Sequence, residues 1–139
     1  MMREITFRGK TVDRDRWVYG SLISLDDDCC FIVPRIDQAS TLSIRDLVRM
    51  EMEAVSPGSI GQYTGVKDKN GVRVFEGDIV RTQFGRLVRI EYRTLEGFVG
   101  FDMTAVEWKH ERPFPSTMWR SENIEVVGNI HDNPEMVRW

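Results

Sequence analysis

The side chains best suited to chemistry in this chain are four arginines between positions 81 and 93. With Glu91 as the only acidic residue among them, they give this stretch a charge of +3 in a chain whose formal net charge is -3. Guanidinium groups beside aromatic rings can hold single-stranded nucleic acid by charge and stacking. The candidate binding residues are therefore Tyr63, Arg81, Arg86, Arg89, Arg93, Trp108 and Trp119.

A second explanation of the arginines is structural. In an alternating strand Arg89 and Arg93 project to one side, whereas Arg86 faces the other side together with Val88. Such arginines can pair across strands with acidic residues, and Glu76, Asp102 and Glu107 are the candidates. We favour these ion pairs over nucleic-acid contacts, and the sequence leaves both open.

The sequence offers no constellation for catalysis or metal binding. His110 and His131 lack a neighbouring nucleophile and show no metal-ligand spacing. Glu76 and Asp78 flank a glycine, as a tight turn requires. The aspartates at 26–28 lack the longer, glycine-containing loop of a calcium site. We expect a protein that is not an enzyme and has neither cofactor nor metal.

The cysteines and the net charge limit the cellular location and the partners that this protein can have. Adjacent Cys29 and Cys30 cannot cross-link distant segments, so we expect reduced thiols on a buried strand. A net charge of -3 gives no global attraction to nucleic acid or anionic lipid. No apolar run approaches the length of a membrane span, and the start of the chain lacks the apolar core of a signal peptide. The expected location is the cytoplasm of a bacterial host, without membrane contact.

Alternation of apolar and polar residues predicts a mainly β protein whose N-terminal part is a β lobe. Strands are expected at 17–25 and 29–33, joined by a solvated loop of aspartates. Within 38–55 the pattern fits either a helix or a strand, and we choose a strand for 48–55. Residues 36–46 are expected to form a surface loop or a short helix.

The central region predicts an antiparallel meander over residues 60–103. Asn70-Gly71 is typical of a two-residue hairpin turn, which would pair 64–67 with 72–75. Glu76-Gly77-Asp78 indicates another tight turn, and alternating strands follow at 86–93 and 97–103. The pattern is similar to the central strands of SH3-like small barrels, which suggests a small, partly open barrel without implying a function.

The last third combines an aromatic, proline-rich segment with a final strand. Residues 104–120 are expected to form a long loop, either functional or a lid that packs its aromatic rings over an open barrel end. A final strand is expected at 121–130. Asn133 followed by Pro134 predicts a short helical turn at the end.

Several motifs spread along the chain carry a family resemblance. They are IGQYTG at 60–65, DKNG at 68–71 and FEGDIV at 75–80, with REITFRGK at 3–10, WVYG at 17–20 and VGNIHDNPE at 127–135. Together they resemble the YopX family of phage and prophage proteins from end to end. The resemblance implies one domain over 1–139, which could divide into sub-lobes 1–55 and 56–139. It carries over no activity and no catalytic or binding residue.

The functional hypothesis that follows is a non-enzymatic interaction module. Its partner would be a phage or host protein, or a second copy in a homo-oligomer, because Tyr, Trp and Arg anchor such interfaces and the chain has 4 tryptophans. The expected open sheet edges and exposed apolar side chains favour assembly. The alternative is a nucleic-acid-binding small barrel that uses the strip from Arg81 to Arg93.

Overall fold

The computed structural model describes residues 3–34, 43, 45, 51–95, 97–105 and 119–137. The described chain is mainly β, all its strand pairs are antiparallel, and its named helical elements are short 3-10 turns. This confirms the predicted fold class. The chain divides into two compact units, residues 2–62 and 63–139, and the division falls inside strand β5 (Gly61–Lys67).

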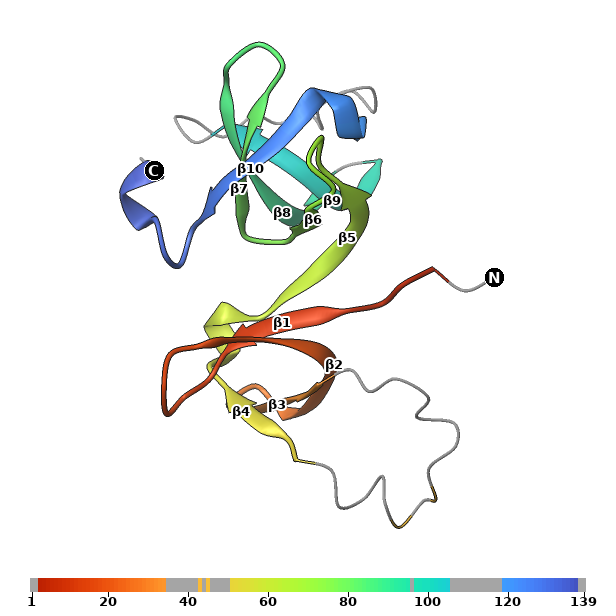
Figure 1. Ribbon diagram of the computed structural model, residues 1–139, viewed down its shortest axis with the longest axis vertical. Helices are drawn as coiled ribbons and strands as arrows, with labels where there is room; N and C mark the ends of the chain where they lie inside the picture. The colour runs from red at the N-terminus through yellow and green to blue at the C-terminus, as the bar shows by residue number, and fades with distance from the viewer. Residues whose placement is uncertain are drawn as a thin grey trace. The chain divides into compact units, whose positions relative to one another are not determined.

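The first unit is a sheet built from consecutive strands. Its strands run in the order β4-β3-β2-β1-β5, where only the first residues of β5 belong to this unit (Figure 1). The other bounds are β1 (Phe7–Lys10), β2 (Trp17–Asp26), β3 (Cys29–Pro34) and β4 (Glu53–Val55), and a 3-10 turn η2 (Pro57–Ser59) precedes β5. The strands expected at 17–25 and 29–33 are confirmed to within one residue.

The region before the central motif is described only in part. Of the strand expected at 48–55, residues Glu53–Val55 form β4, and 48–50 lie outside the described residues. The loop or helix expected at 36–46 also lies outside them, apart from Ser43 and Arg45.

The core of the first unit comes from one face of its strands. Cys30, Ile32 and Val55 are buried there, and Phe7, Val18, Leu22 and Ile60 pack against them. Both cysteines are free thiols, Cys30 buried and Cys29 partly exposed, as predicted. Gly20 of β2 lies so close to β3 that an added Cβ would overlap the Val33 carbonyl oxygen.

The second unit centres on a four-stranded sheet in the order β10-β7-β8-β9 (Figure 1). Its strands are β7 (Asp78–Thr82), β8 (Leu87–Leu95), β9 (Phe98–Ala105) and β10 (Ile124–Asn129). The rest of β5 pairs with β6 (Arg73–Phe75) as a hairpin. Two 3-10 turns, η4 (Ser121–Asn123) and η5 (Pro134–Met136), flank β10.

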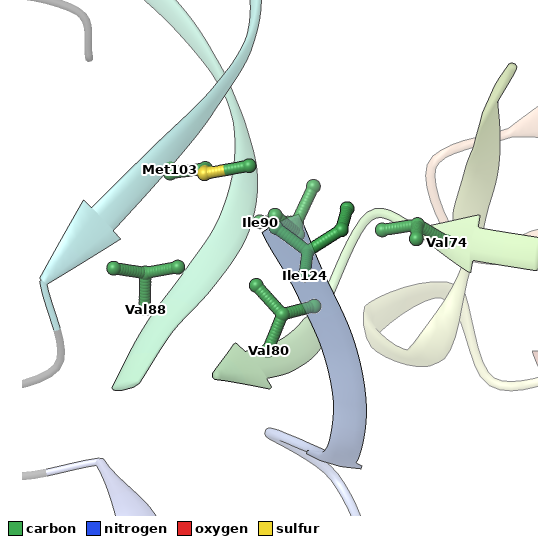
Figure 2. Packing of buried hydrophobic residues seen from close by; sticks show 6 residues of the cluster. All are labelled: Val74, Val80, Val88, Ile90, Met103 and Ile124. Atoms are coloured by element: carbon green, nitrogen blue, oxygen red, sulfur yellow. The ribbon is translucent and has the colours of Figure 1, made fainter. Parts of the chain in front are cut away.

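An apolar cluster lies at the centre of the described part of this unit. Figure 2 shows side chains from β6, β7, β8, β9 and β10 converging on it: Val74, Val80, Val88, Ile90, Met103 and Ile124, each at most 1% exposed. Partly buried Val66, Trp119 and Val126 pack against the cluster. Burial of such side chains is the main source of stability for a unit of this size.

The hairpin at residues 68–72 differs from the expected two-residue turn. The favoured two-residue turn at Asn-Gly needs positive φ at both positions, whereas here Gly71 has a positive φ (78°) and Asn70 does not. The Asp68 N–H donates to the Val72 carbonyl and the Gly71 N–H donates to the Asp68 carbonyl, at 2.8 and 3.0 Å. These bonds define a three-residue loop of Lys69, Asn70 and Gly71, in which a turn is followed by a left-handed residue. The prediction of a two-residue turn was therefore wrong.

The expected meander over 60–103 is interrupted after β6. The predicted turn at Glu76 and Gly77 is present, and the carboxylate of Asp78 accepts the Phe75 N–H across it at 2.7 Å. Beyond it, however, β7 pairs with β8 and β10 instead of β6. The result is a β5–β6 hairpin followed by a β7–β8–β9 meander, and the described strands form no closed barrel.

The end of the chain follows the prediction closely. A strand lies within 121–130 as β10, and a helical turn begins with Pro134. The Asn133 side chain does not cap that turn; its Oδ1 accepts the Asn129 N–H at 3.1 Å. The loop expected at 104–120 lies outside the described residues except at its two ends.

Candidate functional site

Tyr63 and Trp119 line one open groove of the second unit. The groove has a volume of about 640 Å³, and Gly65, Val66, Lys67, Arg120, Ser121 and Glu122 complete its lining. The Tyr63 ring lies 5.7 Å from that of Phe75, and the Arg73 guanidinium lies 5.7 Å from the Tyr63 ring centroid. Tyr63 is only 7% exposed, so its ring is mainly buried in the wall of the groove. Trp108 lies outside the described residues.

Arg81 lines a second cavity, which does not include these two aromatic residues. It shares this cavity, of about 260 Å³, with Lys69, Glu122 and Glu125. The carboxylate of Glu125 is 3.3 Å from the Lys69 ammonium and 3.9 Å from the Arg81 guanidinium. One carboxylate, that of Glu125, therefore contacts both cations of the cavity. Arg86 is exposed and lies at the end of the β7–β8 turn, in which Phe84 is 79% exposed.

Arg89 and Arg93 lie on one side of β8 and contact carboxylates there. The guanidinium of Arg89 is 2.8 Å from a Glu91 carboxylate oxygen. That of Arg93 is 3.7 Å from Glu91 and 3.1 Å from Asp102. The Arg93–Asp102 contact is one of the cross-strand pairs that the sequence suggested.

Three features make this network an internal one. Asp102 is 1% exposed and lies directly opposite Glu91 in the register of β8 and β9. Glu91 also accepts a hydrogen bond from the Thr104 hydroxyl at 2.9 Å. The arginine side chains themselves are only 18% and 12% exposed. Phosphate contacts by Arg89 and Arg93 would thus compete with carboxylates already in place.

The opposite side of the same hairpin carries an apolar surface that sequence reasoning missed. Val88 and Ile90 of β8 and Met103 of β9 point into the core, and two residues further along the same side lie Tyr92 and Phe101. These two residues are register partners, and their rings meet edge to face with centroids 5.6 Å apart. Val99 follows on the same side.

This surface continues the core from Ile90 and Met103 through Tyr92 and Phe101 to Val99, whose register partner Thr94 is polar and exposed. Tyr92 is 54% exposed and Val99 is 64% exposed, whereas Ile90 and Met103 are at most 1% exposed. We call Tyr92, Val99 and Phe101 the hairpin apolar face. The unbroken alternation from Val88 through Ile90 to Tyr92 is the sequence signal that could have located it.

The described residues contain no group of three or more His, Cys, Asp or Glu side chains able to hold a metal ion. The carboxylates of Asp68 and Asp78 accept backbone N–H groups. Among the described residues, no helix is long and apolar enough to cross a membrane.

The fold and these surfaces define a class: a small β protein of two antiparallel units with an apolar sheet face and internal ion pairs. The family described as YopX protein matches residues 6–138, and the chain belongs to this YopX family. This confirms the resemblance found in the sequence.

The solved structures include one with the same fold. The crystal structure of protein EF1440 from Enterococcus faecalis aligns with a TM-score of 0.55 and 22% sequence identity, over 99% of this chain and 100% of that one. The sequence matches no curated protein.

Proposed function

We propose that this protein is a non-enzymatic interaction module that binds another protein through the hairpin apolar face. The partner is a phage or host protein or a second copy of the chain. The observation that carries the proposal is the continuity between Ile90 and Met103 in the core and the exposed Tyr92 and Val99. A contiguous apolar surface that is rimmed by polar residues is typical of protein-binding sites.

The side chains of this face suit an interface anchor. Tyr92 offers a rigid aromatic ring with a polar tip, and its edge-to-face contact with Phe101 fixes its orientation before a partner arrives. Preorganised aromatic residues contribute a large part of the affinity of protein interfaces, because little side-chain entropy is lost on binding.

The alternative partner is single-stranded nucleic acid. Arg86 and the exposed ring of Phe84 favour it, since both lie at the β7–β8 turn and could combine charge with stacking. The carboxylate contacts of Arg81, Arg89 and Arg93 count against it. A net charge of -3 weakens it further.

A capture experiment separates the two. The tagged full chain and its Tyr92→Ser and Tyr19→Ser variants are used to capture proteins from phage-infected host cells, with and without nuclease. Tyr19, 48% exposed in the first unit, is the matched control. We expect a protein that survives nuclease, binds the parent and Tyr19→Ser, and is lost with Tyr92→Ser. Capture that nuclease abolishes would instead support the nucleic-acid alternative, and capture insensitive to Tyr92→Ser would refute the proposed face.

A further inference from the structure

The backbone orientation of β9 follows from two hydrogen bonds at the pair Ile90–Met103. The Met103 N–H donates to Oδ1 of Asp102 at 2.9 Å, and the Ile90 carbonyl accepts the Gly77 N–H at 2.8 Å. Both groups therefore point away from the partner strand in the β8–β9 ladder. Because such groups alternate along an antiparallel strand, Phe101 and Val99 direct their N–H and C=O groups to the outer edge of β9.

Within the described residues, no further strand pairs with this outer edge, and no lysine or proline blocks it. In the part of the chain that the structure describes, β9 is the end strand of its sheet. Its sequence, FVGFDMTA, has neither lysine nor proline, and its one charged residue, Asp102, is buried in contact with Arg93. Native proteins usually block an exposed edge with charge, proline or a bulge.

Asp102 limits the stretch that can pair. Its carboxylate already accepts the Met103 N–H, so that edge position has a partner within the chain. On the Gly97 side of Asp102, the outward-facing groups are those of Val99 and Phe101, on either side of Gly100. An antiparallel strand centred opposite Gly100 would meet both.

We propose that two copies of the chain pair antiparallel along β9 about a two-fold axis at Gly100. Val99 of each copy then lies opposite Phe101 of the other, with the outward N–H and C=O groups of both residues bonded. A second copy fits because the arrangement is self-complementary and brings no like charges together. It also joins the two hairpin apolar faces into one surface. The inference deepens the proposed function, on which it rests, by naming the partner at this edge.

Two substitutions at one position separate backbone pairing from side-chain packing. Val99→Pro removes an outward N–H while leaving the N–H groups that face β8, and proline is tolerated at that kind of edge position. Val99→Thr keeps the N–H and the β-branched shape. Sedimentation of the full chain should show a dimer for the parent and Val99→Thr, with a dissociation constant raised about tenfold or more in Val99→Pro. Thermal unfolding of each variant checks that the fold is retained.

Amide exchange of the parent chain gives a test without substitution. Raising the protein concentration should slow exchange at Val99 and Phe101 and leave Gly100, whose N–H faces β8, unchanged. Concentration-independent exchange at Val99 and Phe101 would overturn the pairing, as would a dimer that Val99→Pro leaves intact or Val99→Thr abolishes. A parent chain that sediments as a monomer would also overturn the β9 pairing. The proposed function would still be supported if the parent captures a protein that Tyr92→Ser does not capture.

Discussion

The carboxylate of Asp68 accepts the backbone N–H of Val126, 58 residues further along the chain, at 2.9 Å. Its other oxygen accepts the N–H groups of Asn70 and Val72, each at 2.9 Å. Asp68 is 3% exposed. The buried Asp68 side chain therefore stabilises the β5–β6 hairpin and connects β10 to it by hydrogen bonds.

Asp68→Asn should destabilise the chain by about 2 kcal/mol. The amide oxygen can still accept from Asn70 and Val72, but the amide NH₂ would face the Val126 N–H, so that two donors meet. Chemical denaturation of this variant beside Asp27→Asn, a change at an exposed loop aspartate, measures the effect. Equal stability of the two variants would contradict the role assigned to Asp68.

Gly71→Val should lower the free energy of unfolding by about 1 kcal/mol or more. The cause is strain, because φ is 78° at Gly71 and an added Cβ meets nothing within 4 Å. Gly58→Val is the matched control, since Gly58 is equally open and has no positive φ. Thermal unfolding should show a lower midpoint only for Gly71→Val. An unchanged midpoint for that variant would contradict the left-handed conformation assigned to Gly71.

These two positions also show what the sequence could and could not predict. Alternation located most strands of both units, because half-buried strands repeat with a period of two. The Asn70-Gly71 turn was misassigned because the Asp68 carboxylate takes the Val72 N–H, and no local pattern reveals that bond. The same holds for β10, whose pairing with β7 depends on contacts far apart in the sequence.

The candidate site was predicted only in part. Tyr63 and Trp119 could be singled out by residue type, and the structure does place both in one groove. The strand register sets Glu91 opposite Asp102 and so provides the carboxylates that Arg89 and Arg93 contact. The sequence alone does not reveal this register. The hairpin apolar face escaped notice because its residues continue the core pattern, and only the structure shows where the core ends.

Arg93→Met should destabilise the chain by about 3 kcal/mol, because it leaves the buried Asp102 carboxylate without that cation. The double variant Arg93→Met with Asp102→Asn should recover part of this stability. Asparagine removes the charge and keeps an oxygen for the Met103 N–H. A double variant less stable than Arg93→Met alone would show that the ion pair is not the cause.

Nucleic-acid binding should be undetectable for the parent chain with single-stranded DNA or RNA at low salt, measured by fluorescence anisotropy. If binding is observed instead, its salt dependence identifies the phosphate-binding residues. Replacing Arg89 and Arg93 together by Ser would then reduce the log-log slope by about 1.4, at roughly 0.7 for each phosphate that the variant no longer neutralises. That result would revive the nucleic-acid alternative.

The most direct test of the proposed interface is the reactivity of Tyr92 itself. Hydroxyl-radical oxidation of the purified chain, free and saturated with its captured protein, can be read residue by residue by mass spectrometry. Phe84, 79% exposed at the β7–β8 turn, is the internal control. We predict that complex formation protects Tyr92 and leaves Phe84 unchanged. Equal oxidation of Tyr92 in the free and bound chain would contradict the assignment of the hairpin apolar face as the binding surface.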